Sequence, residues 1–287
     1  ATLLPFLPVE IWNIISEFLT VLEDWKSFRL TCRMFSHLGP RIWHERIHAH
    51  LIPVTILEGF KSSIDYLTVF DGCLVSAETE GPIQVWNVKE GRCENFFFDV
   101  FLGRNCLTVF EDCLVTGSYD NKIKIWNVEE EKCMKTLEGH TSTIYCLTVF
   151  DGYLVSGSND STIKIWNVKE GKCMKTLEDH SFAIYCLTVF DGYLVSGSYD
   201  KTIKIWNVEE GKCMKTLEGH TSTILCLTVF NGFLVSGSGD KTIKIWNVKE
   251  GKCMKTLEDH SFAIYCLTVF DGYLVSGSYD KTIKIWN

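Results

Sequence analysis

A histidine, a serine and an aspartate recur together four times in this sequence, and these are the three side chains of a hydrolase catalytic triad. The sets, each followed by a tryptophan, are His140, Ser156, Asp160 and Trp166; His180, Ser196, Asp200 and Trp206; His220, Ser236, Asp240 and Trp246; and His260, Ser276, Asp280 and Trp286. A triad enzyme needs one uniquely activated nucleophile, whereas four equivalent serines share this spacing. The repetition therefore predicts a structural role, no catalytic residue and no enzyme activity.

The elements that position these residues recur with a period of 40 residues, marked by Trp86, Trp126, Trp166, Trp206, Trp246 and Trp286. Within one copy, the runs CMKTLE, AIYCLTVF, YLVSGS and TIKIWNV have the composition of short strands, and turn residues separate them. A four-stranded unit cannot bury both faces of its sheet alone, but radial stacking of such units can. The sequence predicts a mainly β protein with a β-propeller of six blades.

The repeats resemble WD40 repeats, through the His, Ser, Asp and Trp positions of the four sets. The resemblance implies that these side chains form a hydrogen-bonded network inside each blade. The WD dipeptide is WN throughout, and the first two copies depart further: Phe60 and Val100 stand at the His position. Residues 171–207 are identical to residues 251–287, as expected from duplication of a pair of repeats.

The ends of the propeller are predicted to join in one blade. The chain stops after the third strand of the last copy, and residues 54–59 align with the outer-strand segment 134–139. We expect residues 54–59 to complete the last blade, which would protect an otherwise open sheet edge. The alternative is a seventh blade in a longer chain, because Ala1 in place of Met suggests a fragment and seven is the commoner number in the family.

Residues 1–50 have a different composition and predict three short helices, because Pro8 suits a first helical turn and apolar residues follow at helical spacing. They resemble the F-box, through residues 7–11, Phe18-Leu19, residues 28–33 and Trp43. The resemblance implies docking on a Skp-type adaptor and a cullin scaffold, as in the substrate receptors of SCF ubiquitin ligases. Candidates for the adaptor-binding surface are Leu7, Pro8, Ile11, Ile14, Ile15, Leu30 and Cys32.

Two alternatives to a ligase receptor stay open. The apolar residues of the F-box-like domain 1–50 could pack on each other or on the propeller 51–287, which would leave a WD40 interaction scaffold with a degenerate F-box. A propeller enzyme or lectin is the third possibility, but every polar group is repeated and no unique metal or acid–base cluster stands out. We therefore expect no cofactor and no metal.

Charge and cysteine content limit the classes of partner and the cellular locations that we expect. The net charge of −8 is carried by residues 51–287, which disfavours nucleic acid and membrane surfaces. No apolar run is long enough to span a bilayer, and the first residues lack a signal-peptide pattern. The 13 cysteines are an odd number without a CxxC motif, so we expect reduced thiols and a cytoplasmic or nuclear location.

The family resemblance also implies where a protein substrate would bind, on the face formed by the loops before the first strand and between the second and third strands of each blade. Two positions of each repeat reach this face, and the candidates for substrate contact among them are Tyr119, Tyr145, Tyr185, Tyr199, Leu225, Tyr265 and Tyr279; Asp65, Asn105, Asn159 and Gly239 occupy others. No arginine follows Arg104, which argues against phosphate recognition by an arginine cluster. We expect an unphosphorylated apolar or basic peptide; alternatively, the tyrosines only pack between blades.

Overall fold

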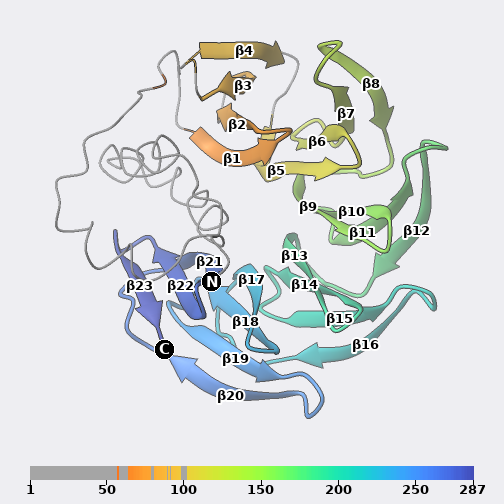
Figure 1. The fold of residues 1–287 in the computed structure, drawn as a ribbon. Helices are drawn as coiled ribbons and strands as arrows, with labels where there is room; N and C mark the ends of the chain where they lie inside the picture. Colours follow the sequence, from red (N-terminus) through yellow and green to blue (C-terminus); the bar gives the residue numbers. More distant parts are fainter. Residues whose placement is uncertain (1–56, 58–63, 79–80, 89, 91, 98–101) are drawn as a thin grey trace, which may run out of the picture.

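The computed structural model describes residues 57, 64–78, 81–88, 90, 92–97 and 102–287, and within this part the chain is a ring of six antiparallel sheets (Figure 1). The six-bladed propeller predicted from the repeats is confirmed. The three-helix F-box and the domain boundary at residue 50 lie outside the described residues. So does the closing strand predicted at 54–59, apart from Leu57, which is in no strand.

Each blade runs from an inner to an outer strand in chain order. Blade 1 contains β1 (Ile64–Phe70), β2 (Cys73–Glu78), β3 (Ile83–Asn87) and β4 (Arg92–Phe97). Blade 2 contains β5 (Leu102–Phe110), β6 (Cys113–Ser118), β7 (Ile123–Asn127) and β8 (Lys132–Leu137). Blade 3 contains β9 (Ile144–Phe150), β10 (Tyr153–Ser158), β11 (Thr162–Asn167) and β12 (Lys172–Glu178).

The remaining blades repeat this order. Blade 4 contains β13 (Ile184–Phe190), β14 (Tyr193–Ser198), β15 (Ile203–Asn207) and β16 (Lys212–Leu217). Blade 5 contains β17 (Ile224–Phe230), β18 (Phe233–Ser238), β19 (Ile243–Asn247) and β20 (Lys252–Leu257). Blade 6 has only β21 (Ile264–Phe270), β22 (Tyr273–Ser278) and β23 (Ile283–Trp286) among the described residues.

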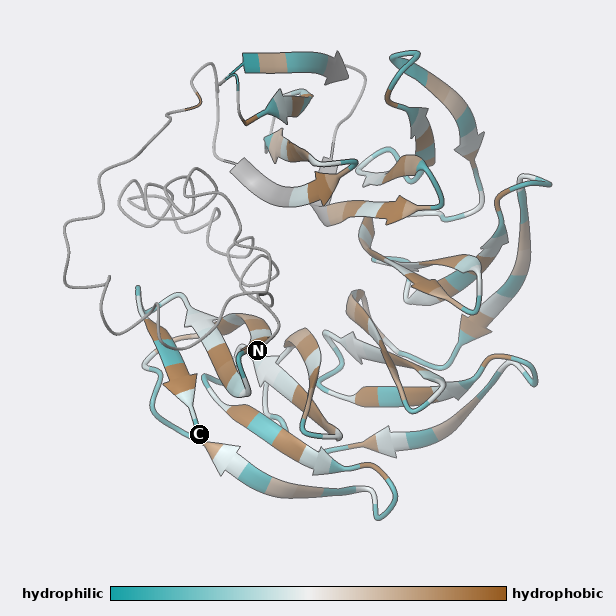
Figure 2. Cartoon of the chain, in the orientation of Figure 1, coloured by the Kyte–Doolittle hydropathy of each residue, from teal (hydrophilic) through white to brown (hydrophobic). Residues whose placement is uncertain are grey.

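The hydrophobic core consists of layers between consecutive blades. In the layer between blades 3 and 4, Trp206 of β15 packs with Val155, Ile163 and Leu177 of blade 3. The second strand of each described blade is buried along most of its length, and in Figure 2 apolar residues mark the strands while the connecting turns are hydrophilic. Each blade therefore depends on its neighbour for burial, as expected for a repeat that cannot fold alone.

Local turn chemistry explains the hairpins. The turn between β13 and β14 is Asp191-Gly192, with φ of 49° and 76°, which suits the two-residue hairpin turn that needs positive φ at both positions. The turn between β15 and β16 begins at Asn207, whose Oδ1 accepts a hydrogen bond from the Glu210 backbone N–H at 3.0 Å. This contact gives the asparagine of the WN dipeptide a structural role.

Candidate functional site

The repeated His, Ser, Asp and Trp lie together inside their blades. In blade 4 the Trp206 Nε1–H donates to Ser196 Oγ at 2.8 Å, Ser196 Oγ lies 2.7 Å from His180 Nε2, and His180 Nδ1 lies 2.6 Å from Asp200 Oδ2. The same three contacts, at 2.6–2.8 Å, join Trp166, Ser156, His140 and Asp160; Trp246, Ser236, His220 and Asp240; and Trp286, Ser276, His260 and Asp280.

The connectivity is that of a hydrolase triad, but the serine is not available as a nucleophile. Because the indole N–H can only donate, Ser196 accepts that bond and donates its own hydrogen to His180, whose Nδ1–H then donates to Asp200. Ser196 has no exposed surface and lies within the blade, so a substrate carbonyl cannot reach its Oγ. The network closes a hydrogen-bonded chain and holds the blade together.

A threonine completes the network, and the sequence analysis missed it. Thr202 donates from both its backbone N–H (2.9 Å) and its Oγ1 (2.6 Å) to Asp200 Oδ1, while the Ser181 backbone N–H donates to Oδ2. Equivalent threonines occupy the corresponding position in blades 3, 5 and 6. The signal was present in the sequence as a threonine two residues after each network aspartate.

These contacts lower the pKa of the network aspartates. Burial alone raises the pKa of Asp200, but the hydrogen bonds from His180 and Thr202 outweigh this effect and leave the pKa well below its usual range. Asp160 and Asp240 shift in the same direction for the same reasons. In blade 6, burial opposed by Thr282 and His260 places the pKa of Asp280 at about 2.

We expect the propeller to lose stability in acid. An aspartate whose folded-state pKa lies below the unfolded value of about 3.9 stabilises the fold fully above that pH, and the contribution is lost as the pH falls toward the folded pKa. The free energy of urea unfolding should therefore fall between about pH 4 and pH 2. Asp280→Asn should show a weaker dependence. Unfolding free energies that stay constant over this interval would contradict the assignment.

Blades 1 and 2 keep only part of the network within the described residues. Trp86 Nε1–H donates to Ser76 Oγ at 2.8 Å, and Trp126 Nε1–H donates to Thr116 Oγ1 at 2.9 Å. Phe60 and Val100, which stand at the His position, lie outside the described residues. The tryptophan-to-hydroxyl bond is thus the most widely repeated element of the network.

The predicted substrate-face tyrosines fall into separate groups. We call the side of the ring that carries them the tyrosine face. The rings of Tyr145 and Tyr185 stack across the junction of blades 3 and 4, with centroids 4.9 Å apart, and Tyr185 contacts Tyr199 at 6.4 Å. Tyr265 meets Tyr279 edge-on at 6.0 Å in blade 6.

Blade 5 separates the two groups. Leu225 and Gly239 occupy its two face positions, so no tyrosine continues the surface from blade 4 to blade 6. Tyr119 lies on blade 2 and is 47% exposed. The Tyr145–Tyr185 stack shows that tyrosines do pack between blades, and it also holds Tyr185 in a fixed orientation beside exposed aromatic surface.

Two further aromatic residues of this face were missed by the sequence analysis. Phe182 and Phe262 are 55% and 51% exposed, and each meets a tyrosine of its own blade edge-on, Tyr199 at 5.8 Å and Tyr279 at 6.0 Å. The Lys241 ammonium lies 5.5 Å from the centroid of the Phe262 ring. Blades 4 and 6 therefore each carry an aromatic triad, of which the SFAIY segment supplies two rings and the SYDK turn the third.

The opposite face is formed by the turns between the first and second strands and between the third and fourth strands of each blade. There, Lys175 Nζ donates to the backbone carbonyls of Val208 and Glu209, at 2.7 and 2.5 Å, and so joins blade 3 to blade 4. Equivalent contacts of Lys135 and Lys215 join blades 2 to 3 and 4 to 5.

The described residues contain no group of three or more His, Cys, Asp or Glu side chains arranged to hold a metal ion. In the same part of the chain no helix has the length and hydropathy needed to cross a membrane. The polar clusters that the structure does bring together are the blade networks, whose groups bond to one another.

The ring of repeated blades defines the class of protein, a β-propeller, and its WD40 repeats indicate a protein-interaction function. The chain belongs to the WD40 family. The family WD domain, G-beta repeat, matches residues 105–127, 131–167, 171–207, 211–247 and 251–287.

Solved structures support the same class. A crystal structure of the computationally designed Ika8 protein is similar to this chain, with a TM-score of 0.71 and 30% sequence identity, over 82% of this chain and 74% of that chain. The comparison with curated proteins gives no match. The first blade, which precedes the residues that the family model matches, is a four-stranded sheet like blades 2 to 5.

Proposed function

We propose that this protein is the substrate-recognition subunit of an SCF-type ubiquitin ligase, in which residues 1–50 dock a Skp-type adaptor on a cullin scaffold and the propeller binds the substrate. The observation that carries the proposal is the combination of an F-box-like sequence with a WD40 propeller in one chain. Ubiquitin transfer would be performed by the partner proteins. Such a complex would act in the cytoplasm, the nucleus or both.

The tyrosine face supports a peptide ligand that is not phosphorylated. Phe182, Tyr185 and Tyr199 offer a cluster of aromatic rings next to one another, suited to burying an apolar side chain or to contacting a cation over a ring face. The matched repeats contain no arginine, whose planar guanidinium would grip phosphate oxygens in a bidentate manner. Lysines occur on the turns of this face, but an ammonium group lacks this planar, bidentate geometry.

The adaptor is expected to co-purify with the full chain through the F-box-like segment. The Skp-type adaptor, mixed with tagged wild-type protein, should be retained, and the double variant Leu7→Ala/Ile11→Ala should lose most of it, because truncating anchors at the centre of an interface costs about 2 kcal/mol or more each. Retention should be unchanged in a Met134→Ala control, whose side chain is exposed on the outer strand of blade 2.

Failure of the adaptor to bind, or equal binding by the double variant, would remove the ligase assignment. The protein would then be a WD40 interaction scaffold with a degenerate F-box, an alternative with which the propeller fold is equally compatible. The circular dichroism spectrum of the double variant separates loss of docking from loss of the propeller fold.

A further inference from the structure

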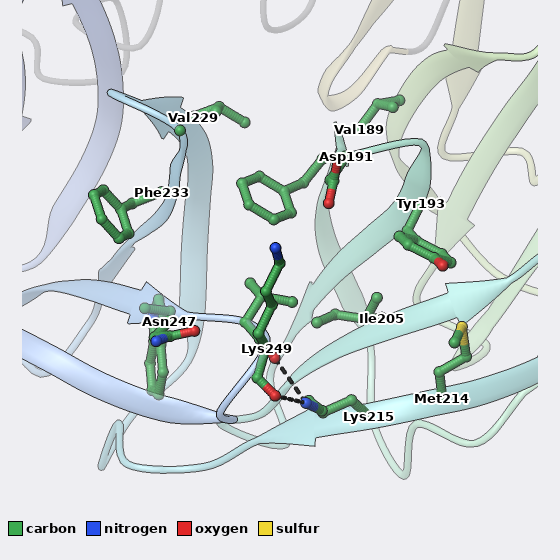
Figure 3. A pocket seen from close by; sticks show the side chains of 14 residues that line it. Val189, Asp191, Tyr193, Ile205, Met214, Lys215, Val229, Phe233, Asn247 and Lys249 are labelled. Atoms are coloured by element: carbon green, nitrogen blue, oxygen red, sulfur yellow. Dashed lines mark hydrogen bonds between the residues drawn. The ribbon is translucent and has the colours of Figure 1, made fainter.

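Two apolar grooves lie side by side on the face opposite the tyrosine face. One groove, of about 1080 Å³, is at the junction of blades 3 and 4, and the other, of about 890 Å³, is at the junction of blades 4 and 5. They share a wall formed by the β13–β14 turn with Val189, Asp191 and Tyr193. Figure 3 shows the second groove, with Val189, Tyr193, Val229 and Phe233 around it.

The apolar lining of the first groove is accessible. Val149, Val189, Tyr193 and Met174 are between 37% and 54% exposed, and Tyr153 adds a second aromatic ring. Exposed aliphatic, aromatic and thioether groups gathered around a concave surface are typical of a site that buries apolar side chains of a partner. The two grooves have almost the same apolar walls, so their differences lie in charge.

The outer-strand lysine that lines each groove contributes no free ammonium. Lys175 in the first groove and Lys215 in the second donate to two backbone carbonyls of the following blade, and Figure 3 shows these bonds for Lys215. The charge of each groove is therefore set by the hairpin turns at its rim and by the residue two positions after the WN asparagine.

That last position faces the hairpin turn of the preceding blade. At the junction of blades 2 and 3 it holds Lys169, whose Nζ lies 3.8 Å from the Glu111 carboxylate. At the junction of blades 4 and 5 it holds Lys249, and Figure 3 shows its side chain rising into the groove on the side of Asp191. Lys169 therefore pairs with the acidic turn of the preceding blade, whereas Lys249 places a cation in the groove that Asp191 also lines, without an ion pair between the two.

The junction of blades 3 and 4 is different, because Glu209 stands at this position. Three carboxylates, those of Asp151, Asp191 and Glu209, line the first groove, and none of them forms an ion pair among the described residues. In the second groove Asn231 replaces one of these aspartates at the equivalent turn. The hairpin therefore does not require the charge, and the acidic rim is a separate property of the first groove.

We propose that the groove between blades 3 and 4 binds a segment of a partner protein in which an arginine or lysine is flanked by bulky apolar side chains. The apolar side chains would pack on Val149, Val189 and Met174, and the cation would lie among the three carboxylates and beside the tyrosine rings. The three carboxylates of the groove favour a segment that carries a positive charge. The second groove, with Lys249 present, disfavours the same segment.

The junction of blades 1 and 2 lacks the aromatic part of this arrangement. Asp71 and Glu129 occupy the equivalent acidic positions, but Cys73 and Cys113 stand where the first groove has its two tyrosines. The combination of an acidic rim with two aromatic walls is thus confined to the junction of blades 3 and 4 among the junctions whose turns the structure describes.

The turns between the third and fourth strands of blades 4 and 5 differ by glutamate or lysine at one position, and exchanging these residues tests the proposal. Glu209→Lys gives blade 4 the NVKEGK turn of blades 3 and 5, and Lys249→Glu gives blade 5 the NVEEGK turn of blade 4, so each variant carries a turn that already folds in this chain. Glu210→Lys changes the net charge equally at a residue of the same turn that does not line the groove. Thermal unfolding should be the same for all three.

The probe is a short fluorescent peptide with one arginine between leucines, titrated against the full chain and followed by anisotropy. Glu209→Lys should weaken binding about tenfold or more, since it replaces an attraction by a repulsion, while Glu210→Lys should not. Lys249→Glu should add a second bound peptide. No binding to the wild type, equal affinities for wild type and Glu209→Lys, or equal losses in both lysine variants would overturn the proposal.

Discussion

Replacing Trp206 by alanine is expected to lower the free energy of unfolding by about 3–5 kcal/mol, the range for removing a large buried aromatic side chain. Trp206 is 1% exposed and lies in the layer between blades 3 and 4, so its loss leaves a cavity at a blade junction. It also removes the N–H that Ser196 accepts at 2.8 Å. Chemical denaturation followed by circular dichroism measures the change.

The chain contains its own control for this prediction. Trp286 lies at the corresponding position of the identical segment 251–287 and makes the same 2.8 Å bond to its serine, but it is only partly buried in blade 6, of which the structure describes three strands. Trp286→Ala should therefore cost less than Trp206→Ala, because less apolar surface is removed from a packed layer. A loss at Trp286 equal to or larger than that at Trp206 would show this account of the burial to be wrong.

Replacing Tyr185 by alanine is expected to weaken peptide binding at the tyrosine face about thirtyfold or more, as for a central aromatic anchor of an interface. Tyr185 stacks on Tyr145 and contacts Tyr199, so it lies in the middle of the larger aromatic group. Peptides would first be selected on an array with the full chain, and their affinities then compared between wild type and variant by anisotropy.

The control for the tyrosine face must separate binding from folding. Met134→Ala, on the outer strand of blade 2, should leave the affinity unchanged, and the thermal unfolding of Tyr185→Ala should show that the propeller persists. Addition of phosphate to the selected peptides should not tighten binding. Phosphate-dependent binding, or affinities insensitive to Tyr145→Ala, Tyr185→Ala and Tyr265→Ala alike, would contradict the proposed ligand class.

Much of the propeller could be predicted because its determinants are local. The 40-residue period, the Asp-Gly and Asn-Gly hairpin turns and the alternation of strand and turn specify one blade, and a repeated blade specifies a ring. The identical segments 171–207 and 251–287 form the same strand order and the same register, as in the Leu194–Trp206 and Leu274–Trp286 pairs. Residues 1–50 keep the F-box assignment only as a prediction from resemblance.

The sequence by itself determined the repeated four-stranded unit, the strand order within each blade and the repeated His, Ser, Asp and Trp, because these follow from periodicity and turn chemistry within one repeat. Tertiary structure alone decided that Lys175 joins two blades, that Phe182 adds to the aromatic surface, and that Glu209 shares a groove with Asp151 and Asp191. It also buried Trp206 more deeply than Trp286 in an identical segment. Each of these depends on a neighbouring blade or strand, and identical residues acquire different exposure and partners when their neighbours differ.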